Sequence, residues 1–249
     1  MVLTVVSLNT WGLPWPISRD REERFAALAE QPVLEADVVG LQEVWTGAPW
    51  RHRRPLIRPR MEADSGLGLL TDYPVHGTAF MAFRTATGVD RLKRKGVFAA
   101  ELELPEIGRV WVASMHAQSG SKRAAPRQIQ LQRAATWLDE LRGDAPLVWV
   151  GDFNLEDHHP VDVETSSWLE ELGFEDAAKH NPEPTWHTAN TWVGRGEARY
   201  DRIYVRDGAD VDVRVLGMEV VLDEQPLSDH YGVLSHLRFD RIETVAEME

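Results

Sequence analysis

The chain has 249 residues, a formal net charge of −13 at pH 7 and no cysteine. The lack of cysteine excludes disulfide bonds, thiolate metal ligands and a cysteine nucleophile. With 43% hydrophobic and 27% charged residues, the composition is typical of a globular protein that buries a large core without cross-links.

No stretch of the chain reaches the roughly 20 consecutive apolar residues that span a membrane. The apolar start, Met1–Leu8, lacks the basic region and the small-residue cleavage site of a signal peptide. We therefore expect a cytoplasmic protein with no stable membrane insertion. Because no linker rich in proline, glycine or serine interrupts the chain, we also expect one domain over residues 1–239, a polar C-terminal tail over residues 240–249 and no obligate protein partner.

Short runs rich in β-branched and aromatic residues recur along the chain and predict strands. In chain order these are Val2–Leu8, Val38–Gln42, Leu67–Thr71, Val97–Leu104, Val110–Met115, Leu147–Gly151, Arg202–Val205, Val211–Met218 and Gly232–Leu237. Apolar residues at helical spacing predict helices at Arg19–Glu30, Pro126–Arg142 and Thr165–Leu172, the last capped by Thr165 or Ser166. Because several strands follow one another without an intervening helix, we expect an α/β sandwich with mixed sheets.

Basic residues form three groups in spite of the acidic net charge. The groups are Arg51, Arg53, Arg54, Arg58 and Arg60; Arg91, Lys93, Arg94 and Lys95; and Lys122, Arg123 and Arg127. Each group can be a solvated face of the protein, or part of a local positive surface that attracts a phosphate-bearing substrate.

Four of the predicted strands are followed directly by an amide, a carboxylate or an imidazole. These side chains are Asn9, Glu43, His116 and Asp152, with Asn154 two positions after Asp152. In open α/β sheets, ligand sites form where the carboxyl ends of strands deliver side chains into a crevice. Taken alone, each residue also fits a structural role, such as a turn, a surface carboxylate or a buried histidine. It is their recurrence at strand ends that indicates a common site.

Together with Asp201, Asp229 and His230 later in the chain, this set suits the transfer of a phosphoryl group to water. Oxygen ligands without thiolates favour Mg²⁺ or Mn²⁺ over zinc, and one or two carboxylates are enough to hold Mg²⁺. Glu43 and Asp229 are the candidate metal ligands, with Asn9 as a neutral ligand or orienting group.

The other residues have candidate roles around the phosphate. Asp152 can accept the proton of the attacking water, while Asn154 and His116 can donate to the non-bridging oxygens. His230 needs a partner that fixes its tautomer, and Asp201 is the best candidate for that partner. Whether Asp152 or His230 is the general base stays open at this point.

Six motifs in a fixed order carry a resemblance to the endonuclease/exonuclease/phosphatase superfamily. They are Ser7–Gly12, Leu41–Val44, His116, Gly151–Asn154, Tyr200–Ile203 and Ser228–His230. The resemblance implies a four-layer α/β/β/α sandwich, in which two mixed β-sheets pack face to face with helices outside. It implies metal-binding roles for Glu43, Asn9 and Asp229, and catalytic roles for Asp152, Asn154, His116, His230 and Asp201.

The chain resembles two branches of this superfamily. Asn9–Pro14, Ser65–Gly68 and Lys95–Val97 resemble neutral sphingomyelinases. Ser119, Arg127, Pro184–Trp186 and Tyr200–Arg206 resemble 5′-tyrosyl-DNA phosphodiesterases. The two resemblances together imply substrate-binding roles for Lys95, Ser119, Arg127 and Trp186.

We therefore predict a Mg²⁺-dependent phosphodiesterase that acts on DNA or a nucleic-acid-linked phosphodiester by metal-assisted attack of water on phosphorus. The alternatives are a hydrolase of phospholipid headgroup esters, similar to the sphingomyelinases, or of inositol phosphates. A protein that keeps the fold and binds its ligand without catalysis is a further alternative, although every expected catalytic position is retained.

Overall fold

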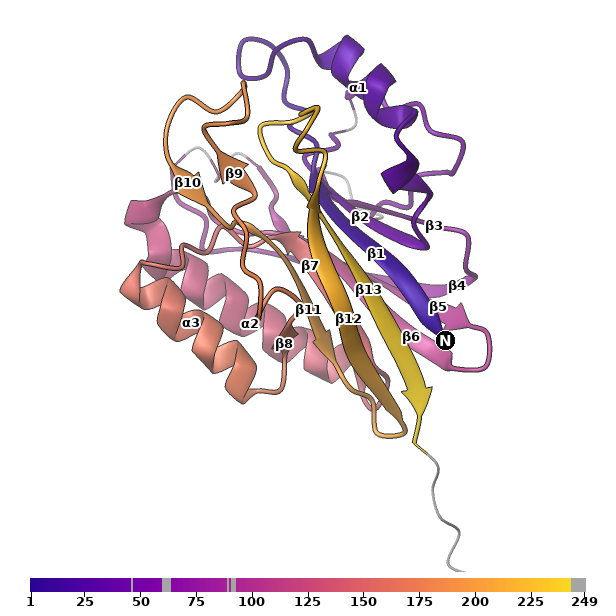
Figure 1. The fold of residues 1–249 in the computed structure, drawn as a ribbon. Coiled ribbons are helices and arrows are strands. Elements are labelled where there is room, and N and C mark those ends of the chain that lie inside the picture. Colours follow the sequence, from indigo (N-terminus) through magenta and orange to yellow (C-terminus); the bar gives the residue numbers. More distant parts are fainter. Residues whose placement is uncertain (46, 60–63, 89, 91–92, 243–249) are drawn as a thin grey trace, which may run out of the picture.

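The computed structural model describes residues 1–242, except for residues 46, 60–63, 89 and 91–92. Within these residues, two mixed sheets face each other (Figure 1). The first sheet has the strand order β12 (Val211–Val221), β13 (Gly232–Arg241), β1 (Val2–Asn9), β2 (Val38–Gln42) and β3 (Gly68–Thr71). The second has the order β4 (Val75–Ala82), β5 (Gly96–Leu104), β6 (Gly108–His116), β7 (Leu147–Asp152), β11 (Asp201–Arg206) and β8 (Glu175–Asp176). The short strands β9 (Trp186–His187) and β10 (Glu197–Ala198) form a separate pair.

The direction of the strands brings several chain segments to one end of the sandwich. β1 runs parallel to β2 in the first sheet, and β6 runs parallel to β7 in the second. β13 is antiparallel to β1, and β11 is antiparallel to β7. Consequently, the carboxyl ends of β1 and β2 lie beside the start of β13, and the carboxyl ends of β6 and β7 lie beside the start of β11.

An apolar core fills the space between the two sheets, with Val5, Val112 and Val150 among its fully buried members. The sheets approach closely at Gly40 on β2, where an added Cβ would lie 2.1 Å from Cγ2 of Val150 on β7. No side chain can be accommodated at that distance. Gly40 is therefore required for the close packing of β2 on β7.

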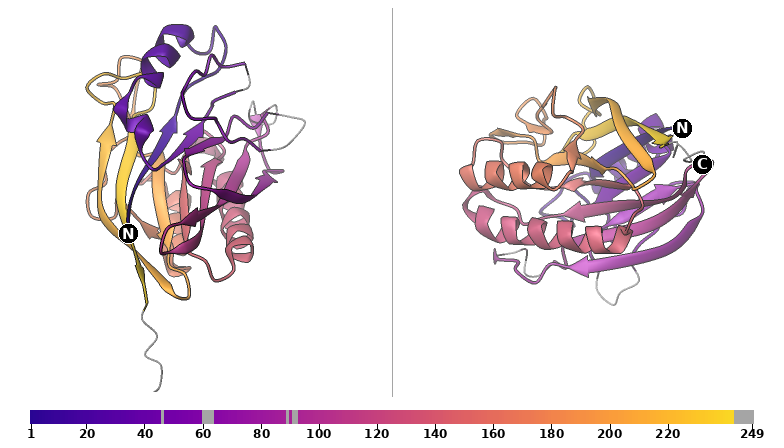
Figure 2. Two further views of the ribbon diagram at one scale, coloured as in Figure 1. Left: turned by 90° about the vertical axis from the view of Figure 1, so that its right-hand side faces the viewer. Right: turned by 90° about the horizontal axis from the view of Figure 1, so that it is seen from below.

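Two long helices cover the outer face of the second sheet (Figure 2). α2 (Ala124–Arg142) and α3 (Pro160–Glu171) pack there over an apolar cluster that includes Leu131, Leu138 and Trp149. The buried α2 residues of this cluster recur at intervals of three, four and seven positions, which places them on one face of the helix: Leu131, Ala134, Ala135 and Leu138.

A shorter helical layer covers the first sheet. α1 (Arg21–Ala29) and the 3₁₀ turn η1 (Pro32–Glu35) contribute the buried side chains of Phe25 and Leu34 to a third apolar cluster. The order of layers is therefore helix, sheet, sheet, helix, which confirms the predicted α/β/β/α sandwich.

The start of α3 differs from the prediction. The helix begins at Pro160, with His159 as its N-cap, so the predicted cap at Thr165 or Ser166 is wrong. Proline suits the first helical position because its fixed φ matches the helix and its missing N–H would have no partner there. Thr165 lies inside the helix and is buried.

Several strands escaped the sequence prediction. β4 is an edge strand whose residues are mostly half-buried or exposed, so its pattern lacks a clear apolar alternation. β8, β9 and β10 have two residues each, too few to give any periodicity. β13 continues through Arg241, while residues 243–249 of the predicted tail and Arg60 and Arg91 of the basic groups lie outside the described residues.

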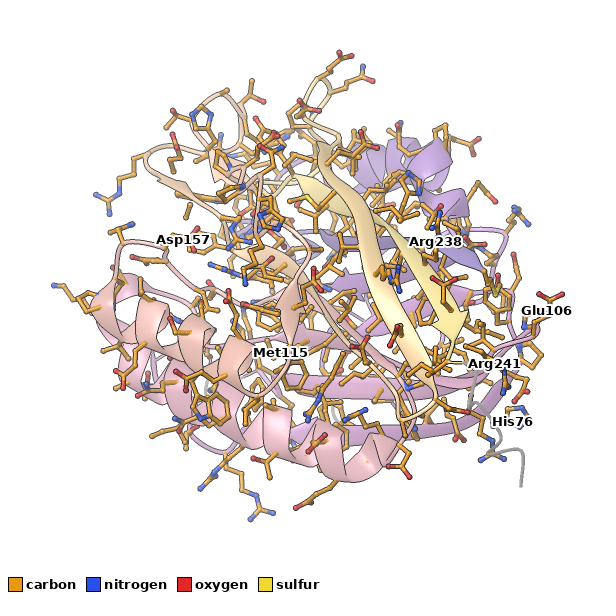
Figure 3. All side chains as sticks on the ribbon, turned by 60° about the horizontal axis from the view of Figure 1, so that its bottom comes forward. His76, Glu106, Met115, Asp157, Arg238 and Arg241 are labelled. Carbon is orange, nitrogen blue, oxygen red and sulfur yellow. The ribbon has the colours of Figure 1, made fainter. Side chains whose placement is uncertain are left out.

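The end of β13 is tied to the turn between β5 and β6, far from the edge where β13 begins. Nε of Arg241 donates to the carbonyl of Glu106 at 2.8 Å, and Nη2 donates to the carbonyl of Ile107 at 2.9 Å (Figure 3).

Among the described residues, none of the helices combines the length and the apolar character needed to cross a bilayer.

Candidate active site

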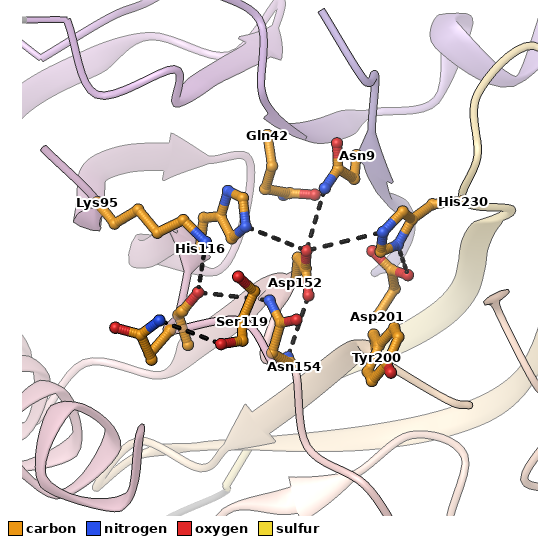
Figure 4. Close-up of polar contacts among 12 residues, drawn as sticks. Asn9, Gln42, Lys95, His116, Ser119, Asp152, Asn154, Tyr200, Asp201 and His230 are labelled. Atoms are coloured by element: carbon orange, nitrogen blue, oxygen red, sulfur yellow. Dashed lines mark hydrogen bonds and ion pairs between the residues drawn. The ribbon is translucent and has the colours of Figure 1, made fainter. Parts of the chain in front are cut away.

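Strands from both sheets end at one edge of the sandwich and bring polar side chains together (Figure 4). In the first sheet, Asn9 at the end of β1 lies opposite Gln42 at the end of β2. In the second sheet, Asp152 at the end of β7 lies between His116 at the end of β6 and Asp201 at the start of β11. The residues predicted from the strand ends are therefore neighbours in register.

Asp152 is at the centre of this arrangement and is 2% exposed. Its Oδ2 accepts a hydrogen bond from Nδ2 of Asn9 at 3.0 Å, and lies 3.2 Å from Nε2 of His116 and 4.0 Å from Nε2 of His230. Its Oδ1 accepts from the backbone N–H of Asn154 at 3.0 Å. Burial raises the pKa of Asp152 to about 7, in spite of the opposing charge of His230.

His230 is held by a second carboxylate. Its Nδ1 lies 2.7 Å from Oδ2 of Asp201, and the same oxygen accepts from Oγ1 of Thr185 at 2.6 Å. Burial alone would lower the pKa of His230, but the carboxylates of Asp201 and Asp152 raise it well above its ordinary value. The surroundings of His230 therefore favour its protonated form, and the predicted pairing with Asp201 is present in the structure.

His116 lies in the opposite electrostatic environment. Burial and the nearby charge of Lys95 hold the pKa of His116 well below its ordinary value. A neutral imidazole has a single N–H, and Nε2 of His116 is the nitrogen that faces Asp152. Among the described residues, Nδ1 of His116 is buried without a hydrogen-bond partner.

Glu43 and Asp229 form the acidic part of the site, where the charges of His230 and Arg24 act against a rise in the pKa of Asp229. Glu43 follows β2, and its Oε2 is buried without a hydrogen-bond partner among the described residues. Burial and the charge of Glu43 raise the pKa of Asp229. Two carboxylates in this state fit a divalent cation, which would provide the missing partner for Oε2 and offset the mutual repulsion.

A second group could also hold a metal by distance alone, because ligand atoms of Asp152, Asp201 and His230 lie within 4.8 Å of one another. An ion that took Oδ2 of Asp201 would compete with its bond to His230, but Oδ1 of Asp201, like Oε2 of Glu43, is buried without a hydrogen-bond partner among the described residues. Both groups therefore offer oxygen donors to a hard cation, and the assignment of Glu43 and Asp229 as its ligands stays a prediction from the sequence.

Asn9 already uses both of its polar side-chain atoms. Nδ2 donates to Asp152, and Oδ1 accepts from the backbone N–H of Trp11 at 3.0 Å. Trp11, Glu43 and Asn154 have φ angles of 48°, 55° and 53°, in a region that non-glycine residues rarely adopt. Three such residues around one site indicate that the surrounding structure holds the loops in a strained, preorganised form.

A model of the Endonuclease/Exonuclease/phosphatase family matches residues 6–230. The chain belongs to this family. Its members are hydrolases that act on phosphoester bonds. The chain is also similar in sequence to a Drosophila melanogaster protein described as "Putative neutral sphingomyelinase". The two are 25% identical over 281 aligned residues. The alignment covers 98% of this chain, and the chain spans 62% of the length of that relative.

Solved structures of two kinds share the fold of this family member. TDP2 of D. rerio in complex with a single-strand DNA product matches with a TM-score of 0.78 and 20% identity, covering 95% of this chain and 99% of that one. Sphingomyelinase C from Streptomyces griseocarneus matches with a TM-score of 0.70, 20% identity and the same coverage of both chains. These similarities confirm the superfamily and the mixed resemblance seen in the sequence.

Two of the predicted substrate-binding residues meet at a shared carboxylate beside the site (Figure 4). Nζ of Lys95 lies 3.2 Å from Oδ2 of Asp90 and donates to the carbonyl of Ala117 at 2.9 Å. The backbone N–H and Oγ of Ser119 donate to the same oxygen of Asp90, each at 3.0 Å. The carbonyl of Ala117 also accepts from Nδ2 of Asn154 at 3.4 Å. Lys95 and Ser119 are therefore linked to the catalytic loops, although Lys95 is itself fully buried.

Arg127 does not face the site. It is wholly buried in α2, where Nε and Nη2 bind both carboxylate oxygens of Asp162 at 2.9 and 2.5 Å. Its Nη1 donates to the carbonyls of Gln118 and Gly120. With its donors committed in this way, Arg127 positions the loop that carries Ser119 and does not reach a substrate directly.

Trp186 lies on the other side of the site, where its ring packs 5.9 Å from the ring of Tyr200. Tyr200 in turn lies 6.0 Å from the ring of His230. Sequence reasoning did not single out Tyr200, Thr185 or Asp90 as site residues. The available signals were weak: Thr185 precedes Trp186 in a matched motif, and Asp90 is an isolated acid in a basic stretch.

Proposed function

We propose that this chain is a divalent-cation-dependent phosphodiester hydrolase in which water attacks phosphorus. The observation that supports this most is the position of Asp152, a buried carboxylate with a raised pKa that lies between His230, whose pKa is raised, and His116, whose pKa is lowered. Such a carboxylate can accept a proton near neutral pH, which a solvated aspartate does poorly.

Asp152 accepts the proton of the attacking water in this proposal. His116, with its single N–H toward Asp152, and Asn9, with its amide toward the same oxygen, orient that carboxylate. Protonated His230 donates to the phosphate as negative charge develops there, while Asp201 fixes its tautomer and keeps it charged. Asn154 is a further donor beside the phosphate position. The sequence left His116 as a phosphate donor, but its neutral state favours the orienting role.

Glu43 and Asp229 would hold the cation, with Asn9 next to them as an orienting group. When bound, a cation such as Mg²⁺ supplies Lewis-acid polarisation of the phosphoryl oxygen and offsets the charge of the transition state. Mn²⁺ has the same ligand preferences and would serve as a substitute.

We propose a nucleic-acid phosphodiester as the substrate class. The shared fold with TDP2 bound to a single-strand DNA product supports it, and so does the charge distribution described in the next subsection. A phospholipid headgroup ester is the second candidate, because the loop after β1 exposes 82% of Trp15 and 58% of Ile17 near Trp11. Exposed tryptophan beside apolar residues is suited to the boundary of a lipid layer.

The activity is tested with bis(4-nitrophenyl) phosphate, a small diester that needs no docking surface. We expect hydrolysis that Mg²⁺ or Mn²⁺ supports and that a chelator abolishes. A panel of single-stranded DNA, RNA, a 5′-phosphotyrosyl oligonucleotide, sphingomyelin and inositol phosphates then identifies the substrate class. Binding of the diester without turnover, with Mg²⁺ present, would instead favour a non-catalytic binding protein.

A further inference from the structure

Beside the site lies a group of six basic side chains, which we call the basic rim. It consists of Arg84, Lys93, Arg94, Lys122, Arg123 and Arg133. Among the described residues, no carboxylate lies within ion-pair distance of any of them. Several other arginines of the chain are paired, as Arg127 is with Asp162 and Arg199 with Asp176, while Arg51 and Arg238 are exposed and lie outside the rim. The rim therefore carries a positive charge that the protein itself does not compensate.

The sequence concentrates this charge in two segments of an acidic chain. Residues 78–100 contain a single acidic residue, Asp90, and residues 117–138 contain none. Asp90 is buried and already accepts from Lys95, Gln118 and Ser119. A chain with a net charge of −13 thus presents one local surface that attracts anions.

The fold brings the two segments together through specific contacts. Oε1 of Gln118, after β6, accepts from the backbone N–H of Thr87, between β4 and β5, at 2.7 Å. Nε2 of Gln118 donates to Asp90 at 2.7 Å. The guanidinium of Arg123 lies against Gly88, where an added Cβ would be only 2.4 Å from its Nη2. The rim is therefore a defined surface in which both segments are fixed to each other.

The rim is also hollowed. A cavity of about 370 Å³ is lined by Phe83, Arg84, Lys93 and Arg94, among others. A second cavity of about 240 Å³ is lined by Phe83, Arg84 and Arg133, among others. Both cavities have Phe83 and Arg84 in their linings, and we call the two together the trough.

The trough begins next to the candidate active site. Ala117, whose carbonyl accepts from Asn154, directly precedes Gln118, which fixes the rim segments to each other. Nζ of Lys93 lies 5.8 Å from the centre of the Trp45 ring, two residues after Glu43. A chain of phosphates that leaves the site on this side would meet the basic rim.

We propose that the trough binds the phosphodiester backbone of a single-stranded nucleic acid whose reacting phosphate lies at Asp152. This rests on the proposed hydrolase function and names the substrate that the same site takes. Six cations that have no ion pair among the described residues, spread over two segments, match repeated phosphates better than the single phosphate of one headgroup. Phe83, which lines both cavities, supplies a ring on which a base can stack.

The test measures binding of a fluorescein-labelled oligo(dT) of about 12 nucleotides by fluorescence anisotropy, in EDTA so that turnover does not interfere. We compare the wild-type protein with the triple variant Arg84→Gln, Lys93→Gln, Arg94→Gln. Each lost phosphate contact lowers the slope of log K against log salt by about 0.7, so we expect a decrease of about 2 and an affinity loss of at least about tenfold.

The matched control is the triple variant Arg51→Gln, Arg214→Gln, Arg238→Gln, which changes the net charge equally at exposed positions outside the rim. Equal weakening by both triple variants would overturn the trough, because it would reflect net charge alone. Unchanged binding by the rim variant would overturn it as well. A third result would also overturn the proposal: a rim variant that no longer binds phosphatidylserine vesicles but still binds the oligonucleotide. That result would identify anionic lipid as the ligand of the trough.

Hydrolysis of bis(4-nitrophenyl) phosphate separates this proposal from the function on which it rests. We expect the rim variant to hydrolyse the small diester at the wild-type rate, which also shows that it is folded. A wild-type protein that binds the oligonucleotide through the rim but leaves the diester intact would contradict the hydrolase function and leave the binding result standing.

Discussion

The two sides of the candidate site differ in how their charges are compensated. On one side, the Asp152, His230 and Asp201 side chains neutralise and orient one another within 4.0 Å. On the other side, Glu43 has a buried oxygen without a partner among the described residues, and the pKa of Asp229 is raised. The first side is held together by contacts between its own side chains, whereas the second is where we propose that a cation binds. The predictions below test this division.

The largest effect is expected for Asp152→Asn. An amide cannot accept the proton of the attacking water, so we expect kcat on bis(4-nitrophenyl) phosphate to fall by about 10³-fold or more. The exposed Asp144→Asn, a few residues earlier, is the matched control and should keep wild-type activity. Unchanged hydrolysis by a folded Asp152→Asn protein would remove Asp152 from the mechanism.

A smaller loss is expected for Asp201→Asn, because Asp201 acts through His230. Without the carboxylate, the imidazole loses its fixed tautomer and the charge that raises its pKa, and we expect kcat to fall by about 10²-fold. The alkaline limb of the pH–rate profile should also move to lower pH, which a purely structural role would not cause. An unshifted limb would argue against the pairing.

On the side of Glu43 and Asp229, the substitution Glu43→Gln should change how the hydrolysis rate depends on the cation concentration. We expect a Mg²⁺ requirement on the order of 10- to 100-fold higher, measured by titrating the hydrolysis rate with Mg²⁺. Exposed Glu224→Gln is the control. A wild-type titration curve for Glu43→Gln would place the cation elsewhere, with the group of Asp152, Asp201 and His230 as the next candidate.

The same substitution should stabilise the protein in EDTA. The pKa of Asp229 is raised in the folded state. The free energy of unfolding therefore falls as the pH rises through this pKa and Asp229 becomes ionised. Removing the Glu43 charge relieves part of this loss of stability, and we expect a higher melting temperature at pH 7 for Glu43→Gln than for the wild type. A lower one would contradict the repulsion.

The smallest expected effect is the pH dependence of the wild-type protein. Asp152 must be ionised to accept a proton, and its pKa is about 7 without a cation. A bound cation lowers that value, so kcat/KM should rise with pH along a limb between about pH 5 and 7. A limb above pH 7 would show that another group controls the acidic side.

Much of this site could be predicted because strand ends are visible in the sequence. Asn9, His116 and Asp152 each follow an apolar run, and parallel pairing of the strands then makes them neighbours. The role of Arg127 could not be predicted in this way. Its matched position indicated a substrate contact, but only the tertiary structure shows that Asp162 and two backbone carbonyls occupy its donors.

The fold shows the same limit. The succession of long elements predicts an α/β sandwich with mixed sheets, and the family resemblance implies its four-layer order. By contrast, β4 and the start of α3 depend on context. β4 is held by pairing with β5 along a solvated edge. Pro160 begins α3 because proline suits the first helical turn. The prediction from apolar spacing placed the start of this helix later, at Thr165.

The Arg127–Asp162 pair has a consequence for how the loops can vary. Arg127 binds the carbonyls of the loop after β6, and Oδ2 of Asp162 accepts from the backbone N–H of Glu156 in the loop after β7. This one ion pair therefore holds the loop after β6 and the loop after β7 in place at the same time. Insertions there would break the clamp, so natural length variation is expected in turns that it does not touch, such as the one between β12 and β13.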